Sequence, residues 1–219
     1  MSVQQKALDR GIEHLYHFTS IENLMSIMER GFIYSRQKVD ELKLANDGYF
    51  TGDYVDHMDN DRFDGLRNYV NLSLSRPNWY LLNKYQQRQE LSHLSWCILC
   101  LNIQPMFEES TLFSVCNAAS TTAKRYGICG DDIGFERMFM SDVVIPSKTY
   151  SRRNLHNSYT TDIQAEVLIK DAININHIKT AFVPSQSKLD QHKAAFKILG
   201  LKSDIFSVNQ ELFSNPILR

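Results

Sequence analysis

The order of short strand-like runs is the feature that most constrains what this chain can fold into. Apolar or alternating runs at residues 69–75, 95–103, 164–170 and 178–183 have the length and pattern of β-strands. Few helical patterns lie between them, whereas a doubly wound sheet needs a helix between successive strands. The sequence therefore predicts a mixed α+β fold.

Length and charge narrow the class of protein further. The 219 residues are enough for one domain with a sizeable core, and no linker or repeat divides them, so we predict a single domain over residues 1–219. The net charge of −1 means that any contact with a polynucleotide must use local basic patches. The sequence has no signal-like apolar core at its start and no membrane-spanning run, which predicts a cytoplasmic protein with no membrane partner.

Two polar motifs interrupt apolar runs that are far apart in the sequence. His17 and Thr19 are two residues apart in the first, and Gln164 and Glu166 in the second. Side chains two apart on a strand share a face, and unpaired polar groups are costly inside a sheet. The two pairs are therefore predicted to meet in one cleft. A carboxylate and an imidazole there would suit an enzyme that binds a ribose and stabilises a developing positive charge.

The segments after the first motif suggest a helix and then a loop. Ser20 is a suitable N-cap, apolar residues follow at helical spacing, and Gly31 stands where a C-terminal cap belongs. Residues 39–66 are acidic, aromatic and punctuated by glycine, so we predict a long irregular excursion of the kind that covers an active site.

The cysteines raise the alternative of a small zinc-dependent nucleic-acid protein. Cys97 and Cys100 have the spacing of a zinc knuckle, and Cys116 and Cys129 follow. However, residues three apart on a strand point to opposite faces, and the segment lacks a residue that favours a turn. We therefore expect buried apolar cysteines and no metal site.

Several segments together resemble the DarT family of DNA ADP-ribosyltransferases, the toxin components of bacterial toxin–antitoxin and anti-phage systems. They are the histidine motif with its helix and residues 62–65, 70–78, 117–119 and 164–169, so the resemblance runs from about Leu15 to Ile169. No single motif is specific, and the order and spacing carry the likeness. The Asn-Leu-Ser-Leu-Ser stretch beginning at Asn71 is more similar to the guanine-modifying branch than to the thymine-modifying one.

The resemblance implies a split, curved mixed sheet with flanking helices, and NAD as a consumed substrate with no prosthetic group. ADP-ribose would pass to a base of single-stranded DNA, nicotinamide would leave, and an antitoxin hydrolase would remove the modification. Glu166 is implied to stabilise the oxocarbenium-like transition state, and Arg62 to assist at the acceptor, with Arg67 as its rival. His17 is implied to donate from a ring nitrogen to a ribose hydroxyl. The positions implied to bind NAD are His17, Thr19, Asn23, Ser73 and Gln164.

The acceptor is expected to lie beside a basic, partly aromatic loop before Glu166, since Arg and Lys suit phosphates and aromatic rings stack unpaired bases. The positions predicted to bind nucleic acid are Asn117, Lys148, Arg152, Arg153 and Tyr159. Two alternatives remain open: a transferase that acts on RNA or protein, and a non-catalytic module of the same fold that binds NAD or nucleic acid.

Overall fold

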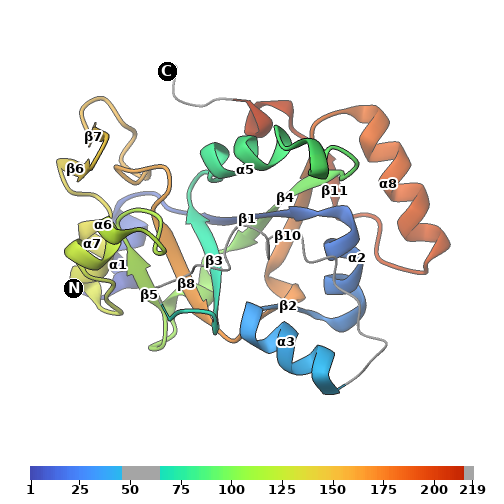
Figure 1. Cartoon of the computed structure of the whole chain (residues 1–219), viewed down its shortest axis with the longest axis horizontal. Helices are drawn as coiled ribbons and strands as arrows, with labels where there is room; N and C mark the ends of the chain where they lie inside the picture. The colour runs from blue at the N-terminus through green and yellow to red at the C-terminus, as the bar shows by residue number, and fades with distance from the viewer. Residues whose placement is uncertain (46–64, 215–219) are drawn as a thin grey trace.

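The computed structural model describes residues 1–45 and 65–214 and confirms the predicted α+β fold, with a large mixed sheet and flanking helices (Figure 1). Over these residues the largest sheet has seven strands in the order β11-β10-β4-β1-β3-β8-β5. Neighbouring strands are antiparallel except β10 and β11, which are parallel. The strands are β1 (His14–Ser20), β3 (Tyr69–Leu74), β4 (Trp96–Asn102), β5 (Leu112–Ser114), β8 (Glu166–Lys170), β10 (Ile178–Val183) and β11 (Phe206–Val208).

Strand β3 has different partners at its two ends, and this divides the sheet. Its last residues pair with β1, with Ser73 opposite Tyr16, whereas Tyr69–Leu72 pairs with β8. Beyond the Tyr16–Ser73 pair the described ladder between β1 and β3 ends, and β3 runs across the direction of β1 (Figure 1). The split leaves the backbone of β3 near Asn71 without a β1 partner strand, and a side chain takes that place.

Helices cover both faces of the sheet. The helices are α1 (Val3–Asp9), α2 (Ile21–Arg30), α3 (Arg36–Ala45), α5 (Trp79–Gln86), α6 (Thr121–Tyr126), α7 (Asp132–Arg137) and α8 (Gln186–Ile198). Leu15 and Leu99 pack in one core with Leu24 of α2 and Phe196 of α8. On the other face, Phe18 packs in the cluster that contains Tyr85 of α5.

The helix predicted after the first motif is confirmed as α2. The Ser20 hydroxyl accepts a hydrogen bond from the Asn23 N–H at 3.2 Å, as expected of an N-cap. Gly31 ends the helix with a φ of +82°, a left-handed conformation that a residue without Cβ adopts without strain.

Two predictions about loops are wrong. Residues 36–45 form α3, so the predicted excursion does not begin at Val39, and residues 46–64, including Arg62, lie outside the described residues. The basic loop predicted before Glu166 instead begins as a strand, β7 (Lys148–Ser151), which pairs with β6 (Asp142–Ile145) across a two-residue turn. The β-branched run of β6 explains this hairpin, because Val143 is fully buried and Tyr150 packs in the same small cluster. A further short ladder pairs β2 (Phe32–Tyr34) with β9 (Ala172–Asn174).

Candidate active site

Glu166 is a buried carboxylate at the first residue of β8, with 6% of its surface exposed. The pairing of Leu72 with Val167 and of Asn71 with Leu168 puts Glu166 on the same face of the sheet as Asn71. Oε2 of Glu166 accepts hydrogen bonds from Nδ2 of Asn71 at 2.9 Å and from the backbone N–H of Ala118 at 3.1 Å. These donors stabilise a charged carboxylate and fix its orientation.

His17 lies where the ladder between β1 and β3 ends, and its ring contacts the backbone of β3. Its Nδ1 lies 2.9 Å from the backbone oxygen of Asn71, and because a carbonyl only accepts, Nδ1 carries the proton. Burial lowers the pKa of His17, and the Asn71 carbonyl only partly opposes this effect, so the ring is neutral at pH 7. In this tautomer Nε2 is an acceptor. With Nδ1–H donated to Asn71, the neutral ring offers Nε2 as an acceptor, whereas the sequence prediction had the ring as a donor.

Asn71 joins the two predicted motifs. Its carbonyl accepts from His17 and its side-chain amide donates to Glu166, so one residue of β3 links β1 to β8. Both predicted residues therefore contact Asn71, His17 through the backbone of Asn71 and Glu166 through its side chain. Sequence reasoning left Asn71 out of the candidate list. The available signal was its spacing of two from Ser73, which placed it on the same face.

Other residues predicted to bind NAD lie on β1, β3 and α2. Thr19 is buried two residues after His17 on β1, and Ser73 is buried on the same face of β3 as Asn71. Asn23 lies in the first turn of α2, and its Oδ1 is buried with no hydrogen-bond partner, which leaves an acceptor for a ligand.

Gln164 is not part of the strand, contrary to the predicted strand boundary. Its N–H donates to Oδ1 of Asp162 at 2.9 Å, and the backbone turns before β8 begins at Glu166. Asp162 is fully buried, and burial raises the pKa of its carboxyl to about 6, although the Gln164 N–H and the Arg76 charge oppose that rise.

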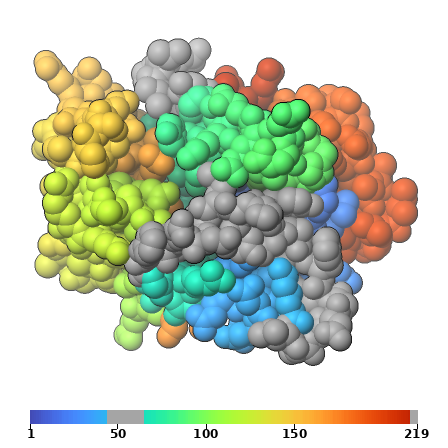
Figure 2. All heavy atoms as spheres, in the orientation of Figure 1, coloured from blue at the N-terminus to red at the C-terminus, as the bar shows by residue number. Residues whose placement is uncertain are grey.

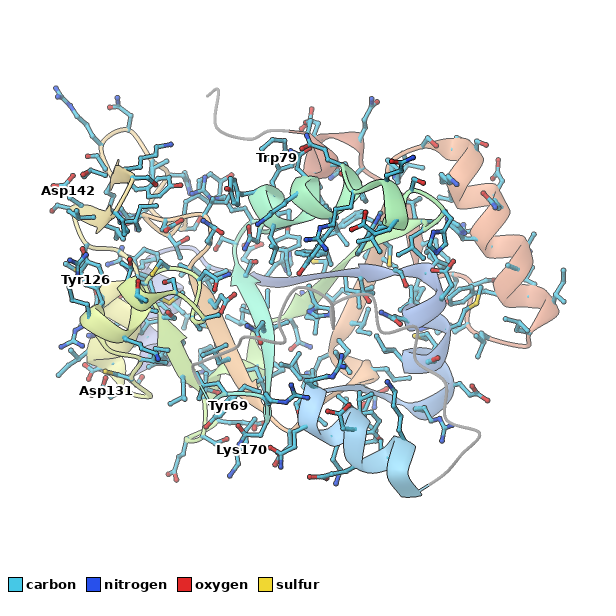
Figure 3. The ribbon with its side chains drawn as sticks, in the orientation of Figure 1. Tyr69, Trp79, Tyr126, Asp131, Asp142 and Lys170 are labelled. Atoms are coloured by element: carbon cyan, nitrogen blue, oxygen red, sulfur yellow. The ribbon has the colours of Figure 1, made fainter. Side chains whose placement is uncertain are left out.

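Arg67, the rival of Arg62, is within the described residues. Its Nη2 donates to Oδ2 of Asp40 on α3 at 2.6 Å, and the side chain is 43% exposed. This pairing ties the start of β3 to α3. Figure 3 labels Tyr69 and Lys170, which are partners at this end of the β3–β8 ladder, away from Glu166.

The basic residues before β8 differ in their contacts and in their exposure to solvent. Arg152 donates to the carbonyls of Tyr159, His156 and Asn157, so its guanidinium holds the loop together. Arg153 is exposed. The ammonium of Lys148, also exposed, lies 4.5 Å from the centre of the Tyr150 ring.

The remaining acceptor candidates are Tyr159 and Asn117. The ring of Tyr159 stacks on the guanidinium of Arg76 at 4.8 Å. Oδ1 of Asn117 accepts from the Ala119 N–H at 3.0 Å, and Asn117 directly precedes the Ala118 amide that holds Glu166.

The family model described as "DarT: ssDNA thymidine ADP-ribosyltransferase" matches residues 16–214. The chain belongs to the DarT family. It is therefore an NAD-dependent ADP-ribosyltransferase, in which NAD is a consumed substrate. A search of curated proteins found no match.

Solved DarT structures share the fold. Thermus sp. 2.9 DarT in complex with NAD+ is 15% identical with a TM-score of 0.58, and the match covers 92% of this chain and 97% of that one. The same protein in complex with ADP-ribosylated ssDNA gives 15% identity, a TM-score of 0.58 and coverage of 92% and 96%. Thermosipho africanus DarTG in complex with ADP-ribose is 17% identical with a TM-score of 0.56, over 91% of this chain and 50% of that chain.

Two further properties bear on the type of site. Among residues 1–45 and 65–214 of this DarT family member, no group of three or more His, Cys, Asp or Glu side chains is arranged to hold a metal ion. Cys97 and Cys100 both lie buried in β4, as the strand prediction required. Among the helices in the described part of the chain, none has the length and apolar character needed to cross a membrane.

Proposed function

We propose that this DarT family member transfers ADP-ribose from NAD to a base of single-stranded DNA, with Glu166 as the catalytic carboxylate. The observation that carries the proposal is the link through Asn71, which holds Glu166 and His17 in one region of the sheet. A buried carboxylate held by the Asn71 amide and the Ala118 N–H is suited to stabilising positive charge on a ribose.

The reaction follows from this placement. The bond between the ribose C1″ and the nicotinamide nitrogen breaks, and its electron pair leaves with nicotinamide. The resulting oxocarbenium-like charge lies against Glu166. A base nitrogen then attacks C1″, and the proton that it loses passes to the carboxylate. The target base must be unstacked to reach the site, which favours single-stranded DNA.

NAD is held by the residues predicted for it. Nε2 of His17 accepts from a ribose hydroxyl, and the buried Oδ1 of Asn23 accepts from the adenosine end of the dinucleotide. Thr19, Ser73 and Gln164 complete this set. Arg62, beyond the described residues, keeps its proposed role as the catalytic arginine at the acceptor.

For the acceptor base we propose guanine, with thymine as the alternative. The support is the Asn-Leu-Ser-Leu-Ser sequence that begins at Asn71 and carries Ser73 and Ser75. The family description names thymidine and favours the alternative. Asn117, Lys148, Arg152, Arg153 and Tyr159 are the proposed contacts with the strand.

We also propose a partner and a place of action. One structural relative is a DarTG in complex with ADP-ribose, and we propose an antitoxin hydrolase that removes ADP-ribose from DNA as the partner of this chain. The reaction needs both NAD and DNA, so we propose that the protein acts in the cytoplasm.

Oligonucleotides that contain a single guanine or a single thymine in an otherwise adenine strand test the proposal. With NAD, the wild-type protein is expected to release nicotinamide and to add the mass of one ADP-ribosyl group to the guanine strand. Glu166→Gln should abolish both signals, because the amide carries no negative charge. Labelling of RNA or protein alone would show that the acceptor is wrong, and NAD binding in a calorimeter without turnover would support the non-catalytic alternative.

A further inference from the structure

A cavity lies at the start of β1. It has a volume of about 270 Å³, and six of the residues that line it are Glu13, His14, Ser75, His156, Ser158 and Tyr159. Three segments that are distant in sequence build it: the residues that lead into β1, the end of β3 and the loop before β8. None of the residues that line it belongs to the Glu166–Asn71–His17 link.

Two polar atoms at the cavity are buried with no hydrogen-bond partner. They are Nδ1 of His14 and Oγ of Ser75. Buried polar atoms are normally paired, so each offers a donor or acceptor to a ligand. Ser75 also has a φ of +62°, a left-handed conformation that is unfavourable for serine, while its N–H donates to the His14 carbonyl at 3.0 Å. Backbone strain of this kind concentrates at functional sites.

The cavity wall supplied by the loop is aromatic. The rings of His156 and Tyr159 have centroids 5.6 Å apart, and Oγ of Ser158 lies 2.8 Å from Nδ1 of His156. Arg76 does not line the cavity, but its guanidinium lies 4.8 Å from the Tyr159 ring centre and donates to the Thr160 carbonyl. Arg76 therefore supports the Tyr159 ring from outside the cavity. An aromatic wall with unpaired polar atoms opposite suits a planar heterocycle that has a hydrogen-bonding edge.

The cavity and Glu166 belong to the same face of the sheet. His14 and Tyr16 alternate onto one face of β1, and Tyr16 pairs with Ser73, which shares its face with Asn71. Ser75 follows Ser73 by two residues, at most about 7 Å along the chain, which is on the scale of one or two nucleotide steps. In Figure 2 the segment around residues 142–160, in yellow and orange, lies against the teal-green segment that leads into α5.

The other end of β1 carries the residues proposed for NAD. Thr19 is five residues from His14, roughly 17 Å along the strand, and Asn23 lies beyond it on α2. Along β1, the cavity is thus on the opposite side of His17 from the residues proposed to bind NAD.

We propose that this cavity binds the nucleobase next to the modified base in single-stranded DNA. This proposal rests on the proposed function and adds to it a subsite for the flanking nucleotide. The flanking base stacks on Tyr159, and its edge bonds to His14 and Ser75. Holding that base fixes the strand while the target base is presented to Glu166.

The substrate side of the test uses oligonucleotides with one target base and one abasic position. The abasic position is placed 5′ to the target, 3′ to it, or several nucleotides away. An abasic residue at one adjacent position should lower kcat/KM for DNA by roughly 5- to 160-fold, the range expected for the loss of one base–aromatic stack. A remote abasic residue should have little effect. Equal activity on all these strands overturns the proposal.

The second part of the test varies the protein and uses the variants Tyr159→Ala and Tyr159→Phe. The alanine variant should lose as much activity on the intact strand as the wild type loses on the adjacent abasic strand, and it should lose nothing further on the abasic strand. The phenylalanine variant keeps the ring and should retain discrimination between the strands. If the two losses simply multiply, Tyr159 does not contact that base and the proposal is wrong.

Two histidine variants and an assay without DNA separate the remaining outcomes. His14→Ala should weaken modification of DNA, whereas His177→Ala, a partly buried histidine bonded to Asn102, is the matched control. Nicotinamide release without DNA reports the KM for NAD. If Tyr159→Ala raises that KM and leaves the KM for DNA unchanged, the cavity belongs to NAD and the inference fails. Absence of any DNA modification by the wild type instead refutes the proposed function, and the subsite with it.

Discussion

Replacing Asn71 by leucine tests whether the link between β1, β3 and β8 matters for catalysis. Leucine has a similar shape but removes the Nδ2 donor that lies 2.9 Å from Oε2 of Glu166. The Ala118 N–H remains as a donor to the same oxygen, and His17 keeps its partner because that partner is a backbone carbonyl. The variant therefore removes this hydrogen bond to a charged group and keeps the hydrogen bonds made by the Ala118 N–H and by His17.

The expected magnitude follows from the strength of such a bond. A hydrogen bond to a charged group contributes about 1.5–3 kcal/mol, which corresponds to a decrease in kcat of roughly 13- to 160-fold if the bond holds Glu166 in its reactive orientation. The assay is nicotinamide release at saturating NAD, with and without DNA. The KM for NAD should change less than kcat, since the change affects the orientation of the carboxylate.

The matched control for this prediction is Asn83→Leu, which makes the same substitution at a partly buried position of α5. It should leave kcat unchanged. The reasoning is refuted if Asn71→Leu folds with a thermal midpoint close to that of the wild type and keeps kcat within twofold of it. It is also refuted if both variants lose activity equally.

Three further predictions concern ionisation and helix capping. Burial raises the pKa of Asp162 from 3.8 to about 6, so the folded state binds the proton more tightly than the unfolded state does. The free energy of unfolding should therefore fall by about 3 kcal/mol as the pH rises from 4 to above 6. Asp162→Asn, whose side-chain oxygen still accepts from the Gln164 N–H, should remove this pH dependence in denaturant titrations. Burial lowers the pKa of His17 below 6.5. In the Asp162→Asn variant, which lacks the Asp162 titration, the rate of nicotinamide release should therefore be constant above pH 6.5 and fall only below it. A fall in rate centred above pH 6.5 would contradict a neutral His17. Ser20→Ala removes the N-cap of α2 and should cost about 1 kcal/mol, a decrease of roughly 2–4 °C in the thermal midpoint by calorimetry, whereas the exposed Ser187→Ala should not change it.

The sequence predicted the parts of the fold that depend on local chemistry. Strand β10 begins and ends where its apolar run does, and α2 lies between its serine cap and its glycine. These elements could be predicted because spacing and caps are local signals. Helix α3 was missed because its residues are mostly polar and form local pairs, such as Arg36 with Asp40, that stabilise a surface helix without an apolar stripe.

The sequence could identify the candidate side chains of the site, but not the backbone groups that hold them. His17 and Glu166 were identified because polar residues in apolar runs are conspicuous. The backbone carbonyl of Asn71 and the N–H of Ala118 have no signature in sequence, since every residue has both groups. Their position depends on the pairing of strands that are distant in the chain, which local patterns do not specify.

The split in the sheet explains why one asparagine contacts both candidate residues, His17 and Glu166. A continuous β1–β3 ladder would pair the backbone of β3 at Asn71 with β1 and would leave no place for an imidazole. Because the described pairing ends at Tyr16 and Ser73, the Asn71 carbonyl accepts from His17 instead. The same carbonyl fixes the proton on Nδ1, and this leaves Nε2 as the acceptor that we propose for NAD. A change that extended the β1–β3 ladder past Ser73 should therefore abolish NAD binding even with both His17 and Glu166 intact.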